Sequence, residues 1–259
     1  MFDFFKKKSK DVPVEVFIDV KKEVDYNDIE PIAKYFHNET GITFEKNKNI
    51  LKSKVKSFCI LRDIYSFDEC LILVKNSPQI RQELINQLTT NETYFFREYA
   101  QIEDLVKSVK SSKQYVEILC APCATGEEPY SIAISLLEAG VSEFGITGID
   151  ISQEALERAY EGVYSSRNVK KLSQDIISKY FTCRDDKYYI NSNIKNMVIL
   201  KHANIFDDDF LNIGKFDYVF SRNMLIYFDK ETKIKAKDIL QKALKNSSNK
   251  VYFGHADLF

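Results

Sequence analysis

Residues 117–150 read E-I-L-C-A-P-C-A-T-G-E-E-P-Y-S-I-A-I-S-L-L-E-A-G-V-S-E-F-G-I-T-G-I-D, and this stretch decides the fold. An apolar run from Val116 to Ala121 predicts a strand, and the small residues up to Gly126 predict a tight loop. Apolar residues at helical spacing follow as far as Gly140, which suits the left-handed position that ends a helix. A second apolar run, Phe144 to Ile149, predicts another strand. The pattern is that of a strand–loop–helix–strand unit.

The ends of this unit predict a nucleoside pocket. Asp150 follows the second strand roughly twenty residues after the glycine loop, where an acid can accept hydrogen bonds from ribose hydroxyls. The loop has a single glycine, Gly126, and two carboxylates, Glu127 and Glu128, stand where a phosphate would need positive charge. This argues against a dinucleotide or ATP and favours a ligand with an ammonium or sulfonium beside its ribose, as in S-adenosylmethionine. A purely structural unit with a solvated glutamate pair is the alternative.

The composition of the whole chain limits the possible functions. Its 259 residues suffice for one large domain or two small ones. Lys and Arg total 37 against 38 Asp and Glu, a net charge of -1, so no bulk attraction to nucleic acid is expected. No apolar run is long enough to span a membrane and no secretion signal is visible, which predicts a cytoplasmic protein without membrane insertion. Five cysteines then indicate reduced thiols, and the lone C-x-x-C at Cys120 and Cys123 predicts no metal site.

The first part of the chain predicts a tail or arm over residues 1–25 and a small helical domain over 26–88. One of its helices, from about Lys46 to Asp63, has a face rich in basic residues. Such a face is usually only solvated, but it is also what a docking surface for an acidic protein partner requires. The candidate docking residues are Lys48, Lys52, Lys54, Lys56 and Arg62.

Residues 89–112 are predicted to be a linker or lid. The segment T-T-N-E-T-Y-F-F-R-E, 89–98, carries more polar and aromatic groups than packing needs, and Arg97 would bring a positive charge near the two glutamates. The alternative is a helix start capped by Asn91 or Thr93, with the two phenylalanines in the core.

Strand and helix patterns alternate through residues 113–259 and predict a parallel sheet flanked by helices, with a small β-hairpin appendage at about 181–195. Ligands of such sheets bind beyond the carboxyl ends of the strands. Those ends carry Gly126, Asp150, Asn204 and Asn223.

Four motifs together resemble a known family. They are T-N-E-T-Y-F-F-R-E (90–98), A-T-G-E-E-P-Y-S (124–131), G-I-D-I-S-x-x-A-L (148–156) and F-D-x-V-F-x-R-N-x-x-I-Y-F (216–228). In this order they resemble the chemotaxis receptor methyltransferases, the CheR family, over roughly Asp28 to Phe259. The resemblance implies a helical domain joined to a Rossmann-like, S-adenosylmethionine-dependent methyltransferase domain. It also implies methyl esterification of glutamate side chains on the cytoplasmic helical domains of chemoreceptors, with S-adenosylhomocysteine as product.

The resemblance assigns roles to matching positions. Arg97 and Tyr227 would face the reacting centre, and the basic helix would dock the receptor. Which of the two glutamates holds the methionine ammonium stays open. With Gly126 from the strand ends, the expected cofactor contacts are Asn91, Thr93, Arg97, Glu127, Glu128, Asp150, Asn204, Ile205, Asn223 and Met224.

This sequence also departs from the family pattern. Pro122-Cys123-Ala124-Thr125 replaces the usual S-x-G or S-T-G before the two glutamates. After G-H-A-D the family's sheet has a further antiparallel hairpin, whereas the sequence given stops at Phe259. We therefore expect either a sheet that is short at that edge or a sequence cut from a longer chain.

Alternative functions remain open at this stage. A methyltransferase acting on another protein or on nucleic acid could share the fold, although R-N-M-L-I-Y lacks the prolines of the N-P-P-Y motif of amino-group methylation. A module that binds S-adenosylmethionine without catalysis is a third possibility. We expect a monomer.

Overall fold

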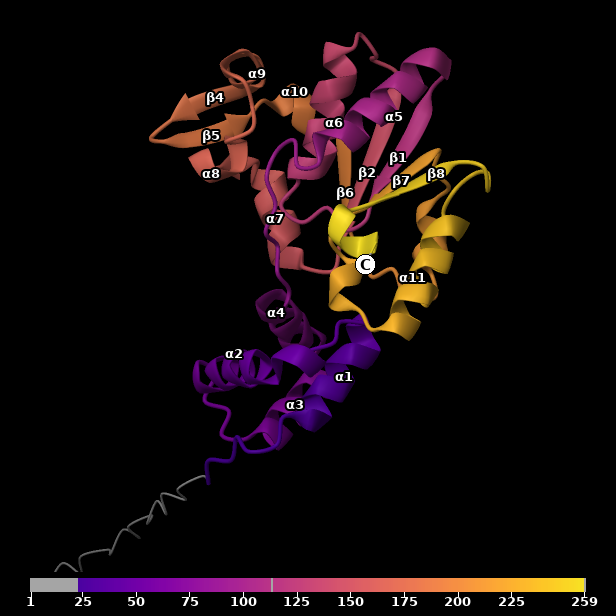
Figure 1. Ribbon diagram of the computed structural model, residues 1–259. Coiled ribbons are helices and arrows are strands. Elements are labelled where there is room, and N and C mark those ends of the chain that lie inside the picture. The colour runs from indigo at the N-terminus through magenta and orange to yellow at the C-terminus, as the bar shows by residue number, and fades with distance from the viewer. Residues whose placement is uncertain (1–22, 113, 259) are drawn as a thin grey trace, which may run out of the picture.

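The computed structural model describes residues 23–112 and 114–258, and Figure 1 shows two domains. Most of the predicted tail, residues 1–22, lies outside the described residues. The smaller domain is helical and the larger is built around a sheet, as the sequence predicts. The helices of the smaller domain are α1 (Glu30–Thr40), α2 (Lys48–Ile60), α3 (Phe67–Asn76) and α4 (Pro78–Leu88), with a 3-10 turn at Glu45–Asn47.

The helical domain has its own core and well-defined helix ends. Leu51, Val55 and Phe58 on α2 are fully buried against the other helices. Gly41 ends α1 with a φ of 73°, and the Ser77 hydroxyl accepts the Ile80 N–H at the start of α4. Glycine and serine are favoured at such helix ends. The helix predicted from about Lys46 to Asp63 lies close to the observed α2.

The larger domain contains a five-stranded sheet in the order β6-β2-β1-β7-β8, and every neighbouring pair is parallel. This confirms the predicted sheet. The strands are β1 (Val116–Cys120), β2 (Phe144–Asp150), β6 (Val198–His202), β7 (Tyr218–Ser221) and β8 (Lys250–Phe253). The flanking helices are α5 (Tyr99–Ser112), α6 (Glu127–Glu138), α7 (Gln153–Glu161) and α11 (Lys230–Lys242).

The predicted hairpin is present as part of a second, antiparallel sheet in the order β3-β5-β4. Asp185 and Asp186 form its tip, both with positive φ. Figure 1 shows this sheet projecting from the edge of the larger domain. Its strands are β3 (Val163–Tyr164), β4 (Phe181–Arg184) and β5 (Lys187–Ile190), and the short helices around it are α8 (Ser166–Val169), α9 (Gln174–Tyr180) and α10 (Ser192–Lys195).

The segment predicted as a linker or lid contains a regular helix. Residues 89–98 are irregular, but Tyr99–Ser112 form α5, which packs against α6. Because this helix begins at Tyr99, the alternative in which Asn91 or Thr93 caps it is wrong. Phe95 is fully buried, and its ring meets Tyr164 edge-on at a centroid distance of 4.8 Å. The irregular segment is therefore fixed to the larger domain.

The two domains meet at the carboxyl ends of the strands. The Thr43 N–H donates to the carbonyl of Tyr227 (2.9 Å), and Ile42 pairs with Phe228 in an isolated bridge. The Gln82 amide donates to the carbonyl of Ile151 (2.8 Å), just beyond β2. The helical domain therefore closes over the sheet edge at which ligands of this fold bind.

Candidate functional site

The loop after β1 turns sharply before α6. Gly126 has a φ of 91°, a left-handed conformation, and a Cβ there would lie 2.7 Å from the Tyr130 ring and 3.0 Å from the Ala159 side chain. Only glycine meets both conditions without strain. Gly126 therefore shapes the loop and does not line the two cavities described below. Its contact with the cofactor stays a prediction.

Asp150 at the end of β2 is buried and oriented by backbone groups. The Ala124 N–H donates to its Oδ2 and the Ser152 N–H to its Oδ1, each at 2.8 Å. Burial raises the pKa of Asp150 to about 6, although these two hydrogen bonds act to lower it. Each carboxylate oxygen keeps a second acceptor site. Asp150 can therefore accept hydrogen bonds from a diol in the adjoining cavity.

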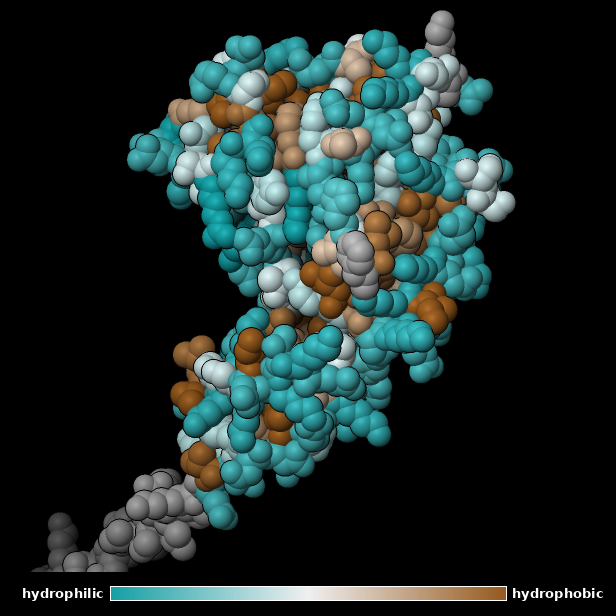
Figure 2. All heavy atoms as spheres, in the orientation of Figure 1, coloured by the Kyte–Doolittle hydropathy of each residue, from teal (hydrophilic) through white to brown (hydrophobic). Residues whose placement is uncertain are grey.

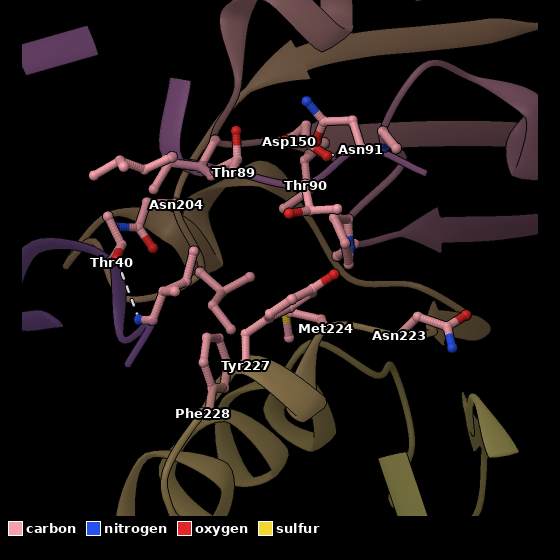
Figure 3. Close-up of a pocket in the computed structure, with 18 of the residues that line it drawn as sticks. Thr40, Thr89, Thr90, Asn91, Asp150, Asn204, Asn223, Met224, Tyr227 and Phe228 are labelled. Atoms are coloured by element: carbon pink, nitrogen blue, oxygen red, sulfur yellow. Dashed lines mark hydrogen bonds between the residues drawn. The ribbon is translucent and has the colours of Figure 1, made fainter. Parts of the chain in front are cut away.

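A largely apolar cavity lies between the two domains, in front of Asp150 (Figure 3). The helical domain contributes Ile42, Phe44 and Leu88, and the sheet edge contributes Ile205 and Met224. Asn91 from the irregular segment lines the same cavity. An apolar cleft with a few polar groups at one side is typical of a nucleoside site.

A second cavity adjoins the first and is more polar. Asn91, Asn223 and Tyr227 line both cavities, so the two are continuous along these residues. Arg97 and Thr93 line the second cavity only. The structure thus brings Arg97 and Tyr227, which lie 130 positions apart in the sequence, to one space beside the nucleoside pocket.

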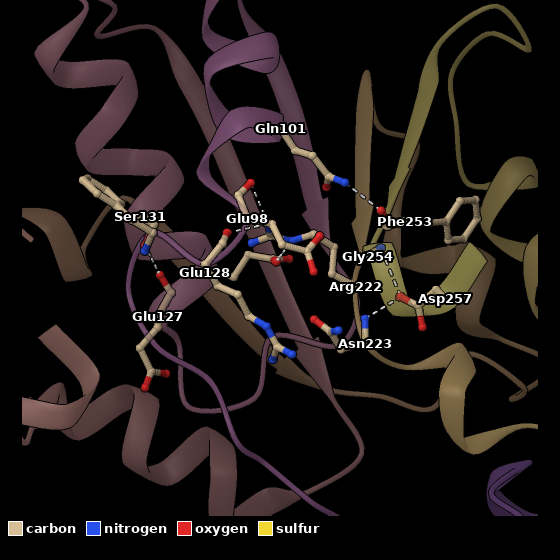
Figure 4. A network of polar contacts seen from close by, with 12 residues as sticks. Glu98, Gln101, Glu127, Glu128, Ser131, Arg222, Asn223, Phe253, Gly254 and Asp257 are labelled. Carbon is tan, nitrogen blue, oxygen red and sulfur yellow. Dashed lines mark hydrogen bonds and ion pairs between the residues drawn. The ribbon is translucent and has the colours of Figure 1, made fainter. Parts of the chain in front are cut away.

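The two glutamates at the start of α6 have different surroundings, and their side chains point apart (Figure 4). Glu127 is satisfied within the protein, because Thr125 Oγ1 donates to its Oε2 (2.6 Å) and Asn168 Nδ2 donates to its Oε1 (2.7 Å). Glu128 lines the second cavity, and its Oε1 is buried without a hydrogen-bond partner in the described structure. An unpartnered buried carboxylate oxygen at a cavity wall suits an ammonium ligand. Of the two acids, Glu128 alone presents such an oxygen to the cavity.

Arg222 is a site residue that the sequence analysis missed. Its guanidinium pairs with Glu128 Oε2, and the two side chains are only 2% and 10% exposed. The same guanidinium donates to the carbonyl of Arg97 (2.7 Å). Burial raises the pKa of the Glu128 carboxyl, while the Arg222 charge acts to lower it. Arg222 thereby joins α6, the irregular segment and the loop after β7.

Asp257 holds the loop after β7 in place. Its carboxylate accepts the backbone N–H groups of Asn223, Ile226 (3.2 Å) and Gly254 (3.0 Å), as part of the network in Figure 4. Asn223 is left-handed, with a φ of 61°, a strained conformation that such bonds can maintain. The carboxylate thus fixes the backbone that carries Tyr227.

Two other predicted cofactor contacts, Asn204 and Thr93, already form hydrogen bonds within the protein. Asn204 lines the first cavity, but its Nδ2 donates to the carbonyl of Glu39 (2.7 Å) and its Oδ1 accepts the Phe206 N–H (3.0 Å). Its side chain therefore ties the two domains together. Thr93 lines the second cavity, and its carbonyl accepts a long hydrogen bond from Asn168 Nδ2 (3.4 Å).

The basic residues predicted for docking lie outside these cavities, four of them on α2 and Arg62 just after its end. Lys48 pairs with Glu30, and Arg62 pairs with Glu83 at 2.7 Å. The other three form no ion pair with the described residues: Lys52 and Lys54 donate to the carbonyls of Asn27 and Gln87, and Lys56 lies 5.7 Å from the centroid of the Tyr26 ring.

The described residues contain no cluster of three or more His, Cys, Asp or Glu side chains placed to hold a metal ion. None of their helices combines the length and the apolar character needed to cross a bilayer.

Comparisons with known proteins agree with this geometry. The family model of the CheR methyltransferase SAM-binding domain matches residues 91–259, and that of the CheR methyltransferase all-alpha domain matches residues 27–89. A chemotaxis protein methyltransferase of Campylobacter jejuni (strain 81-176) is 36% identical over 89% of this chain and 88% of its own. Chemotaxis protein methyltransferase 2 of Vibrio cholerae is 33% identical over 86% of this chain and 82% of its own. The chemotaxis protein methyltransferase of Borreliella burgdorferi is 32% identical over 89% of this chain and 88% of its own.

The fold and the site thus define an S-adenosylmethionine-dependent methyltransferase. The chain belongs to the CheR methyltransferase family. The fold class, the cofactor and the resemblance predicted from the sequence are confirmed, and the function is confirmed at the level of a chemotaxis methyltransferase.

Proposed function

We propose that this protein transfers the methyl group of S-adenosylmethionine to glutamate side chains on the cytoplasmic helical domain of chemoreceptors. The observation that carries the proposal is the common cavity of Arg97, Tyr227 and Glu128 beside the nucleoside pocket. The names of the relatives, which are chemotaxis protein methyltransferases, support the choice of acceptor.

The cofactor would be held along both cavities. Asp150 would accept the ribose hydroxyls and the apolar wall with Ile205 would enclose the adenine. The free oxygen of Glu128 would accept the methionine ammonium. Bound in this way, S-adenosylmethionine supplies an electrophilic methyl group on a sulfonium. Asn91, Asn223 and Met224 line the path between the two ends.

The reaction needs no general base. A glutamate carboxylate, with a pKa near 4.3 in water, is already ionised at neutral pH. The residues of the site therefore contribute by positioning, which can supply on the order of 7–11 kcal/mol when the reacting groups are well oriented. Arg97 would orient a carboxylate with its planar guanidinium, and Tyr227 would position the acceptor.

We assign the recognition of the receptor to the helical domain. Residues 26–88 would dock the acidic partner through Lys48, Lys52, Lys54, Lys56 and Arg62, and residues 113–259 would carry out the chemistry, joined by 89–112. Lys52, Lys54 and Lys56 have no carboxylate partner among the residues that the structure describes, which supports this proposal, since an acidic surface would compensate them. The protein would act in the cytoplasm as a monomer, where these receptor domains lie.

The test is transfer of labelled methyl groups to purified receptor cytoplasmic fragments. We expect base-labile methyl esters on glutamate. Base-stable label, or label on RNA or on unrelated proteins only, would contradict the proposal.

The Arg97→Lys variant tests the mechanism in the same assay. Lysine keeps the charge but lacks the planar fork, so we expect kcat/KM to fall about 10-fold or more, the cost of one charge-assisted hydrogen bond. Full kcat/KM in this variant, with normal binding of S-adenosylhomocysteine, would show that Arg97 has no orienting role.

A further inference from the structure

A second group of basic side chains lies at the rim of the cavity that holds Arg97 and Tyr227. It consists of Arg167, Lys170 and Lys171, which lie on and just after α8 and are exposed. Lys170 Nζ lies 4.5 Å from the centroid of the Tyr94 ring, and the Arg97 guanidinium lies 5.9 Å from the same centroid. Tyr94 lines the cavity. Tyr94 is therefore a common neighbour of the Arg97 guanidinium and the Lys170 ammonium.

The rim is held rigidly against the site. Asn168 of α8 donates from Nδ2 to Glu127 Oε1 (2.7 Å), and its carbonyl accepts the Phe95 N–H (2.9 Å). Ser165 and Asn168 also close a capping box at the start of α8. Because α8 is bonded both to α6 and to the irregular segment, the backbone from which Lys170 and Lys171 extend is held against the site.

The charge of the rim is only partly compensated. Arg167 pairs with Glu92, an exposed contact. Within residues 23–112 and 114–258, no carboxylate forms an ion pair with Arg97, Lys170 or Lys171. The chain as a whole has a net charge of -1, so this excess is local. The surface around α8 is mainly hydrophilic in Figure 2, as a polar docking surface requires.

We propose that Lys170 and Lys171 bind acidic side chains of the receptor helix that lie one turn from the acceptor glutamate. This inference rests on the proposed function. Residues three or four positions apart on a helix have Cβ atoms about 5–6 Å apart. An acceptor glutamate that enters the cavity between Arg97 and Tyr227 therefore places its helical neighbours over the rim. The rim selects which glutamates are methylated, independently of the docking surface on α2.

The test compares two charge-reversed variants with the same change in net charge. K170E/K171E alters the rim, whereas K107E/K110E alters two exposed lysines of α5 outside the cavities. We expect K170E/K171E to raise the KM for a receptor fragment about 10-fold or more at low salt, and the effect to shrink at high salt. Its kcat and its Kd for S-adenosylhomocysteine should change less than about twofold, as should all parameters of K107E/K110E.

A change in the receptor fragment completes the experiment. When the acids one turn from the acceptor glutamate are replaced by glutamine, wild type and K170E/K171E should bind the fragment with equal affinity. If K170E/K171E matches K107E/K110E in KM and in fragment binding, the inference is wrong and the proposed function stands. If K170E/K171E weakens fragment binding but wild type forms no esters, the rim binds acidic side chains of the fragment, but the proposed glutamate methylation is wrong, and with it the selection of acceptor glutamates. No binding of the fragment by wild type would overturn both.

Discussion

Replacing Glu128 by glutamine tests which acid of the glutamate pair binds the cofactor. The amide oxygen can still accept from Arg222, but the amide nitrogen then faces the cavity. An amide NH2 group is a donor, so it cannot accept a hydrogen bond from the methionine ammonium. A hydrogen bond between charged groups contributes about 1.5–3 kcal/mol. At about 1.4 kcal/mol for each tenfold change, we expect the Kd of S-adenosylhomocysteine to rise about 10- to 140-fold.

Glu127→Gln is the matched control, because it makes the same chemical change at the neighbouring position. Glu127 already accepts bonds from Thr125 and Asn168, and neither cavity includes it. We expect the Kd of this variant for S-adenosylhomocysteine to stay within about threefold of wild type. The loss of binding free energy would then be below the 1.4 kcal/mol of a tenfold change. Isothermal titration calorimetry measures the Kd values of both variants, and thermal unfolding confirms that both variants fold. Equal losses of affinity, or a larger loss for Glu127→Gln, would refute the assignment to Glu128.

Two further predictions concern buried charges. Arg222→Met leaves the buried Glu128 carboxylate without its cation, so denaturant unfolding at pH 7 should show a loss of about 3–5 kcal/mol. Without Arg222, the folded-state pKa of Glu128 would lie still further above its unfolded value. Lowering the pH toward about 4.3 then protonates the buried carboxylate, so the loss of unfolding free energy should shrink and should not grow. For Asp150, whose pKa is raised to about 6, protonation removes the negative charge that accepts the ribose hydroxyls. The Kd of S-adenosylhomocysteine should therefore rise below about pH 6, and Asp150→Asn should bind weakly with no such pH dependence; a constant wild-type Kd from pH 7 to 5 would contradict this.

The sheet and its acidic strand end were predictable because they depend on local patterns. Apolar runs that end in Asp150, and a glycine loop followed by a helical pattern, determine one strand–loop–helix–strand unit with little help from the rest of the chain. The helix α5 was also encoded locally. Ile102, Leu105 and Val109 are fully or almost fully buried and recur at helical spacing, a signal that the linker interpretation did not use.

The contacts that decide the chemistry depend on the tertiary arrangement and could not be predicted in the same way. β7 lies beside β1 in the sheet, and this places Arg222 opposite the start of α6. No spacing in the sequence indicates that neighbour relation. The sequence did offer one signal for this ion pair. Arg222 directly follows a predicted buried strand, and Glu127 and Glu128 follow another predicted strand. The amide of Asn204 likewise finds its partner, Glu39, in the other domain.

The helical domain forms part of the site. Thr43 donates its N–H to the carbonyl of Tyr227, and Ile42 lines the nucleoside cavity from the same segment. Any displacement of this domain by a bound receptor would therefore move the backbone of Tyr227 and one wall of the cofactor pocket together. The docking proposed above would thus be linked to cofactor binding through one short segment after α1.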